Sequence, residues 1–170
     1  MLTVLRHLLS ILLLPFLVVV LVPSWLLNVL AASDSRWLAS SPVVWLTRFI
    51  GALIIFAGLM LFIWCVSLFG KVGQGTLAPW DPTRNLVAIG PYQYVRNPMI
   101  IGVALLLIGE ALFWGSWVVG VWALIFILIN HIYFVLSEEP GLEERFGESY
   151  RSYKENVPRW LPRLKLRSGR

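Results

Sequence analysis

This 170-residue chain has little charge. Asp, Glu, Lys and Arg make up 14% of its residues, hydrophobic residues make up 58%, and the mean hydropathy is +0.77. A soluble domain of this size needs much more polar surface to cover its core. The composition excludes an ordinary water-soluble domain and predicts a protein that lies in a membrane.

Cysteine is nearly absent as well, and Cys65 is the single example. One thiol excludes a disulfide framework and a cysteine metal site within the chain, so we expect no metal and a small apolar packing role for Cys65.

The net charge of +5 and the pI near 9.8 are compatible with nucleic acid, but no nucleic-acid-binding motif accompanies the basic residues. We expect the lipid bilayer, with its anionic headgroups, as the partner instead, and no nucleic acid.

The apolar residues gather in long runs, each sufficient to cross the roughly 30 Å hydrocarbon core as a helix rising about 1.5 Å per residue. The last two runs together would form a helix about twice as long as the bilayer is thick, so we expect a hairpin that turns at Gly115–Ser116. The first run could be a secretory signal, but it is longer than a usual signal core and we favour a retained helix. The sequence predicts an all-α polytopic membrane protein with about four transmembrane helices, near residues 8–30, 43–69, 98–114 and 116–137.

The basic residues predict an orientation. Eight of the fourteen lie after Ser137, and Lys71, Arg84 and Arg96 lie between the second and third apolar runs. Because cytoplasmic segments carry the excess of Lys and Arg, we expect both regions and both termini in the cytoplasm. A bacterial inner membrane is our expectation for the location, and the sequence does not indicate an oligomeric state.

Two polar regions remain for chemistry: the loop 71–97 and the tail from Glu138 onward. In the tail, apolar residues recur at spacings of three and four until Pro158, which predicts one amphipathic helix. This helix either lies at the headgroup boundary or covers a site that opens to the cytoplasm. We expect residues 1–70 to form a two-helix scaffold and residues 71–170 the functional core.

Polar side chains at membrane depth are costly and are functional candidates by default. Glu110 lies near the expected outer turn, where a structural or interfacial role is favoured, and Asn130 and His131 are better read as hydrogen-bonding groups than as bases. Glu138 and Glu139 end the fourth run, where the helix dipole is itself negative, so the two adjacent carboxylates need a cation nearby.

Two motifs in the second half of the chain carry a resemblance. The first is Leu86-Val87, Gly90-Pro91-Tyr92 and Val95-Arg96-Asn97-Pro98, ending at Gly102; the second is Glu138-Glu139-Pro140-Gly141-Leu142, Phe146-Gly147, Tyr150, Tyr153 and Val157-Pro158-Arg159. In this order, around an apolar hairpin, they resemble the isoprenylcysteine carboxyl methyltransferase family and its relatives among the phospholipid N-methyltransferases. The resemblance covers about residues 84–163.

The resemblance implies an enzyme that transfers a methyl group from S-adenosyl-L-methionine to a lipid-like or isoprenoid-linked acceptor. Its pocket would lie between the loop and the end of the fourth span, with Glu138 or Glu139 on the cofactor ammonium and Arg96 on its carboxylate. We expect Arg96 and Asn97 as catalytic residues. The expected cofactor-binding residues are Leu86, Val87, Gly90, Pro91, Tyr92, Arg96, Asn97, Pro98, Gly102, Glu138 and Glu139.

The chain also departs from the family pattern. Asn97 stands where the family has His, and Ile100 where it has Tyr, so no base that titrates near neutral pH is available there. A carboxylate acceptor needs no base, which favours methylation at a carboxylate oxygen; the alternatives are a phospholipid amine N-methyltransferase and a non-catalytic membrane scaffold. The stretch 133–135 lacks the Arg that the eukaryotic carboxyl methyltransferases have before the Glu pair, which speaks against prenylated cysteine as the acceptor. Pro140 predicts a kink after that pair.

Overall fold

The computed structural model describes residues 13–30, 32–34, 43–73 and 85–163, and all regular secondary structure within these ranges is helical. The described part therefore confirms the all-α prediction. Its elements are η1 (Leu17–Leu21), α2 (Val22–Val29), α3 (Val44–Leu68), η2 (Phe69–Gly73), η3 (Gly90–Gln93), α4 (Pro98–Trp114), α5 (Trp117–Tyr133), η4 (Phe134–Glu138), α6 (Glu139–Phe146) and α7 (Glu148–Asn156).

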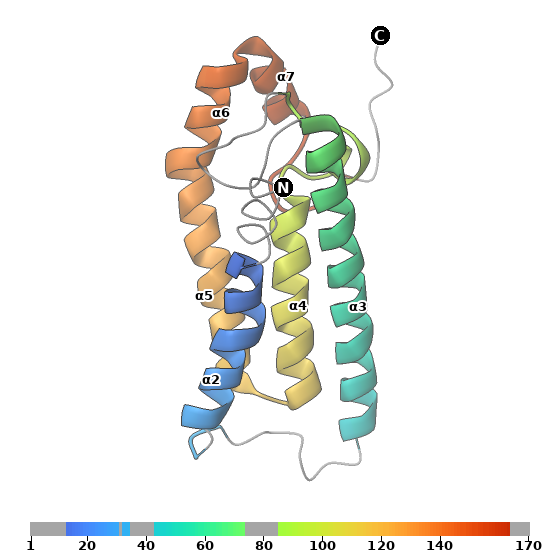
Figure 1. Ribbon diagram of the computed structural model, residues 1–170, viewed down its shortest axis with the longest axis vertical. Helices are drawn as coiled ribbons and strands as arrows, with labels where there is room; N and C mark the ends of the chain where they lie inside the picture. The colour runs from blue at the N-terminus through green and yellow to red at the C-terminus, as the bar shows by residue number, and fades with distance from the viewer. Residues whose placement is uncertain (1–12, 31, 35–42, 74–84, 164–170) are drawn as a thin grey trace, which may run out of the picture.

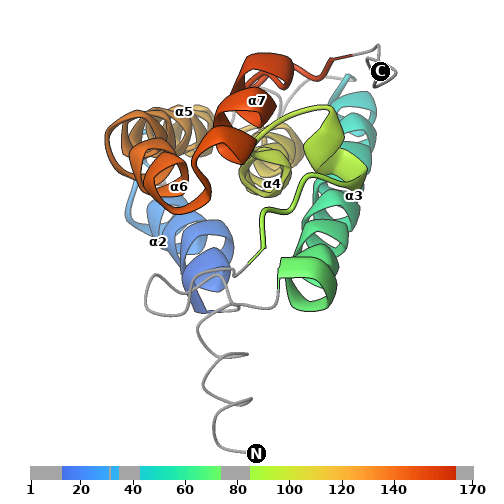
Figure 2. The same cartoon turned by 90° about the horizontal axis from the view of Figure 1, so that it is seen from above.

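The four long helical segments lie side by side along the long axis of the molecule (Figure 1). Helix α4 lies between α3 and α5, α6 continues the column of α5, and α7 turns back over the end of α4 (Figure 2). We call the end that carries α6, α7 and residues 85–97 the site end. The opposite end, which carries Gly115, is the turn end.

Two helices are long and apolar enough to cross a bilayer: Val44–Leu68, with a mean hydropathy of 2.7, and Trp117–Phe146, with 2.2. The other apolar helices, Leu13–Val29 and Pro98–Trp114, are shorter. Large apolar side chains on the outer face of α3 are exposed, Trp45 by 73%. Such a surface suits hydrocarbon and not water. The architecture is that of a membrane protein, and four crossings remain a prediction.

Helices α3 and α4 approach each other along a seam of glycines. A Cβ atom at Gly51 would lie 2.8 Å from the carbonyl oxygen of Gly109, and one at Gly58 would lie 2.7 Å from that of Gly102. Small residues at such spacing let membrane helices touch through their backbones. Cys65, one further heptad along α3, is completely buried, as its expected packing role requires.

The turn between α4 and α5 lies where the sequence predicts it. Gly115 adopts a left-handed conformation with φ of 65°, and the Ser116 hydroxyl accepts a hydrogen bond from the Val119 amide at 3.2 Å. Ser116 also donates to the Asp34 carboxylate, at 2.6 Å, and both side chains are buried. Local caps therefore stop one helix and start the next, while Asp34 ties the segment after α2 to the turn.

The tail differs from the single amphipathic helix that its periodicity predicts. Helix α6 ends at Phe146 and α7 begins at Glu148, because Gly147 has φ of 53° and ψ of −128°, a conformation that side chains other than hydrogen strongly disfavour. The apolar face of the tail packs on the protein, since Tyr150 and Val157 are buried. Of the two roles left open, covering a site fits this burial better.

Pro140 lies inside a helix that runs from Trp117 to Phe146. Residues Phe134–Glu138 form a π-helical turn that ends two residues before Pro140. A proline cannot donate to the carbonyl four residues earlier, and the wider turn accommodates this loss. The local response to Pro140 is thus a π turn, a feature that recurs at functional sites.

Candidate functional site

The segment 85–97 is shaped by its glycine and proline. Gly90 adopts φ of 59°, and a Cβ atom there would lie 3.0 Å from Leu68 Cδ1. Pro91 follows at the start of the short 3-10 helix η3 and is buried. This local geometry turns the next side chain, Tyr92, inward against α3.

Tyr92 is 6% exposed and packs in a cluster with Cys65 and Val87. Its ring centroid lies 5.7 Å from that of Phe69, and its carbonyl oxygen accepts a hydrogen bond from the Tyr153 hydroxyl at 2.8 Å. Burial raises the pKa of the Tyr92 phenol, with Cys65, Tyr153 and Glu138 adding to the rise. The hydroxyl itself is buried without a hydrogen-bond partner among the described residues.

Arg96 and Glu139 form an ion pair between the loop and α6. Arg96 Nη1 lies 2.9 Å from Glu139 Oε1, and the side chains are 11% and 7% exposed. The contact is one of charge and not a well-directed hydrogen bond, because Nη1 finds no acceptor in good geometry, and neither does Nε, within the part of the chain that is described. The guanidinium also contacts the Tyr150 phenol; burial raises the pKa of Tyr150 and Arg96 partly lowers it.

Two further cations surround Glu139. Arg159 Nε lies 2.6 Å from Oε1 and Lys154 Nζ lies 3.6 Å from Oε2. The hydrogen bond to Glu139 raises the pKa of Arg159. Lys154 Nζ also lies 3.5 Å from Glu143 Oε2, so it is shared between two carboxylates. The cations that the Glu pair needs are therefore present, and all of them lie at Glu139.

Glu138 stands apart from this network. Its side chain is half-buried, and no ion pair or hydrogen bond to it is present among the described residues. Its charge adds to the raised pKa of both Tyr92 and Tyr150, so its carboxylate lies close to both phenols. An unpaired carboxylate in a partly enclosed, aromatic setting is suited to receiving a cationic ligand.

Residues 157–163, which we call the C-terminal strap, cross the site end. The Arg96 amide donates to the Pro158 carbonyl at 2.9 Å, and the Arg163 amide donates to the Tyr94 carbonyl at 2.9 Å. Trp160 donates from Nε1 to His131 Nδ1 at 3.1 Å. The strap is thereby attached both to the loop and to α5.

The remaining predicted site residues divide into three places. Leu86 and Val87 lie on the loop, half-buried and buried respectively. Asn97 is the first residue before α4, where its carbonyl accepts from the Ile101 amide at 3.1 Å and its side chain makes no capping bond. Pro98 and Gly102 are buried within α4, and Gly102 lies against Gly58. The structure brings the loop residues, Arg96 and the Glu pair together; a cofactor contact by Gly102 stays a prediction, and its position shows a packing role.

Of the intramembrane polar residues, His131 contacts the strap at the site end, whereas Glu110 and Asn130 make no contact with it in the described part of the chain. Glu110 lies thirteen residues along α4 from Asn97, about 20 Å at the helical rise, and its Oε2 is buried without a partner among the described residues. The Asn130 amide donates to the Phe126 carbonyl of its own helix at 2.8 Å. His131 accepts from Trp160, which agrees with a hydrogen-bonding role.

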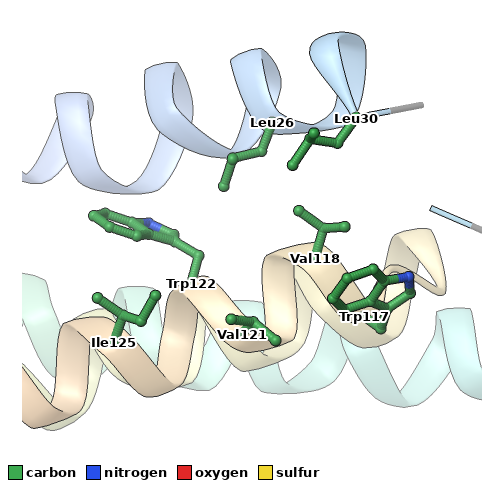
Figure 3. Close-up of a pocket in the computed structure, with 7 residues that line it drawn as sticks. All are labelled: Leu26, Leu30, Trp117, Val118, Val121, Trp122 and Ile125. Carbon is green, nitrogen blue, oxygen red and sulfur yellow. The ribbon is translucent and has the colours of Figure 1, made fainter. Parts of the chain in front are cut away.

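A groove at the turn end has a different character (Figure 3). Helices α2 and α5 line it with apolar side chains only, among them the indole faces of Trp117 and Trp122, which flank Val118 and Val121. It offers no group for acid, base or ionic chemistry. This groove therefore holds no candidate for the chemistry.

Sequence reasoning left out several residues that complete the site. Three of them, Tyr150, Tyr153 and Arg159, were not expected in the pocket. Their place in the second motif is the sequence signal that could have identified them. Lys154 and Trp160 carry no such signal, because their roles depend on how α7 and the strap fold back.

The fold and the site define a class of protein: a helical membrane protein whose polar groups converge at one end of an apolar bundle. Residues 46–149, more than half of the chain, match the family described as phospholipid methyltransferase. The chain belongs to the phospholipid methyltransferase family.

Two of the curated relatives are named as methyltransferases. The chain is 37% identical over 81 residues to a methanethiol S-methyltransferase of Pseudomonas deceptionensis, covering 46% of this chain and 29% of that protein. It is 34% identical over 80 residues to a protein-S-isoprenylcysteine O-methyltransferase of Schizosaccharomyces pombe, covering 45% of this chain and 33% of that protein. A protein of Haemophilus influenzae described as uncharacterized is 36% identical over 63 residues, which is 37% of this chain and all of that one. The match thus spans about a third of the two named methyltransferases.

Proposed function

We propose that the protein is an S-adenosyl-L-methionine-dependent methyltransferase of the membrane that methylates a lipid-like acceptor at a carboxylate oxygen. Membership of the family and the names of two relatives support methyl transfer. The observation that carries the proposal is that one carboxylate without a partner, Glu138, and one guanidinium with a free donor, Arg96, both lie at the site end. By the positive-inside rule, we propose that this end faces the cytoplasm, where the cofactor is available.

The side chains at this end fit the cofactor. Its amino-acid portion has an ammonium, for which Glu138 is free, and a carboxylate, for which Arg96 has a buried Nε without an acceptor among the described residues. Half-buried Leu86 offers apolar surface for the adenine, beside the buried Val87 and Tyr92. When bound, the cofactor would supply a methyl group already activated by the sulfonium.

The residues of the chain then need to position the cofactor and the acceptor and to exclude water from them, and they do not need to supply a strong acid or base. The strap and α7 cover the site end and restrict water, while the ion pair at Glu139 holds the loop in place. Holding two reactants in line and excluding water supply much of the acceleration of such a displacement.

Two observations support an acceptor that is already ionised. Asn97 cannot take a proton near neutral pH. Nδ1 of His131 accepts a hydrogen bond from Trp160, so that nitrogen already has a structural partner in the strap. A carboxylate acceptor needs neither residue as a base.

An amine acceptor, such as a phospholipid headgroup, is the second candidate. The unpaired Glu138 favours it, because a carboxylate without a partner can take the proton that an ammonium must lose before it attacks. The two candidates place opposite demands on Glu138: the carboxylate reading uses it to hold the cofactor, and the amine reading uses it as a base.

Calorimetric titration of S-adenosylmethionine and S-adenosylhomocysteine into detergent-purified protein tests the cofactor. We expect Glu138→Gln to weaken binding by about 10- to 100-fold, since a hydrogen bond to a charged group contributes roughly 1.5–3 kcal/mol. The matched control is Glu144→Gln on the exposed face of α6, which should bind like wild type. No binding of either compound by folded wild-type protein refutes the enzyme and leaves the non-catalytic scaffold.

Incubation with methyl-labelled cofactor and fractionated membrane lipids then identifies the acceptor. A product whose label is released as methanol by mild alkali is a carboxyl ester, and an alkali-stable product with added mass on its headgroup amine is an N-methyl lipid. The second result would replace the carboxylate acceptor with the amine.

A further inference from the structure

The two adjacent glutamates at the site end are in different electrostatic situations. Glu139 has Arg96 Nη1 at 2.9 Å, Arg159 Nε at 2.6 Å and Lys154 Nζ at 3.6 Å. Glu138, one residue earlier, has no such partner in the described part of the chain. The two carboxylates of one motif therefore have different surroundings: Glu139 is paired with cations of the protein, and Glu138 is not.

Glu139 and its three partners come from four separate segments. Arg96 belongs to the loop, Glu139 itself to α6, Lys154 to α7 and Arg159 to the strap. The same strap is paired with the loop through the Arg96 and Arg163 amides. One buried carboxylate therefore stands at the point where every segment of the site end meets.

The three cations also leave Glu139 poorly placed to bind a ligand. Its side chain is 7% exposed, and a positively charged group approaching it would meet the guanidinium groups of Arg96 and Arg159 first. Arg96, by contrast, has a buried Nε whose N–H finds no acceptor among the described residues. Glu139 therefore orients a guanidinium that can still donate a hydrogen bond to a ligand.

We infer that Glu139 is a positioning residue: it fastens the C-terminal strap over the site and aims Arg96 at the carboxylate end of the ligand, while Glu138 alone faces the ligand's ammonium. The second part of this inference rests on the proposed function. The first part concerns the protein without any ligand, and it can be tested separately.

Hydrogen exchange on the ligand-free protein tests the strap. In Glu139→Gln, Arg96 and Arg159 would lose their common counter-charge, while Lys154 would keep Glu143. We therefore expect the Arg96 and Arg163 amides to exchange at least about tenfold faster, the factor that 1.4 kcal/mol represents. Arg159→Met removes only the strap side and should show the same loosening if Glu139→Gln does not fold. The control is Glu148→Gln, whose side chain is 85% exposed and lies 3.7 Å from Arg151; it should exchange like wild type.

Binding of two ligands separates the tasks of the glutamates. S-adenosylhomocysteine has both ammonium and carboxylate, and its decarboxylated analogue keeps only the ammonium. Glu139→Gln should weaken binding of the first by about tenfold or more and leave the analogue within about twofold of wild type, because its effect passes through Arg96. Glu138→Gln should weaken binding of both, a distinction that a general loss of structure would not produce.

Either of two results would overturn the inference. Unchanged exchange at Arg96 and Arg163 in Glu139→Gln would show that Glu139 does not hold the strap. Equal losses for both ligands in Glu139→Gln would show that its effect does not pass through Arg96 and the ligand carboxylate. If wild-type protein binds neither ligand, the proposed function fails, while the exchange data still decide the role of Glu139 in the strap.

Discussion

The glycine seam between α3 and α4 allows a sharp prediction. In Gly58→Ala the new methyl group would lie 2.7 Å from the Gly102 carbonyl oxygen and 3.0 Å from the Leu106 amide nitrogen. Both are backbone atoms and cannot rotate away, so the two helices must separate by several tenths of an ångström along the seam. Overpacking of this kind costs about 1–3 kcal/mol.

The matched control is Gly120→Ala on α5, where the nearest atom to the new methyl group is Ala111 Cβ at 3.9 Å. Both changes give the same gain in helix propensity, so the difference between them isolates the seam. By thermal unfolding in detergent, we expect Gly58→Ala to melt about 3–10 °C below Gly120→Ala, at roughly 2–4 °C per kcal/mol. S-adenosylhomocysteine affinity should fall as well, because Cys65, which packs against Tyr92, lies on the same helix. Equal melting temperatures would refute the close approach of α3 and α4.

Three further changes test individual features of the fold. Ser116→Ala removes the cap of α5 and its bond to Asp34, and should lower the free energy of unfolding by about 1–3 kcal/mol in a thermal or denaturant titration; an unchanged value would contradict the cap. Trp160→Phe keeps a ring in the strap but removes the donor to His131, so we expect severalfold faster exchange of the strap amides with little change in melting temperature. Gly147→Ala places a side chain at φ of 53° with no atom within 4 Å, so only backbone strain of about 1–3 kcal/mol should appear, and a neutral result would argue against the break between α6 and α7.

The helical hairpin could be predicted from the sequence because its signals are local. Pro98 begins α4, Gly115 ends it and Ser116 caps α5, and each acts within a few residues of its own position. The apolar runs between them have the length of helices. Composition and caps therefore sufficed for this part, with no knowledge of what packs against it.

The break in the tail could not be read from the same kind of pattern. Phe146 and Tyr150 keep the spacing of one continuous helix across Gly147. The conformation of Gly147 depends on tertiary packing, in which α7 lies across the bundle and Tyr150 is buried. Helical periodicity indicates which face of the tail is apolar, but it does not indicate that the helix axis changes direction at Gly147.

The candidate site was found in part. The motifs pointed to Arg96 and to the Glu pair, and the structure brings these together. The motifs did not show that Glu139 has cationic partners and Glu138 has none. Two of those partners lie in α7 and in the strap, and they reach Glu139 only because these segments fold back over the site end. Adjacent residues in a sequence share a neighbourhood along the chain, but their partners come from the fold.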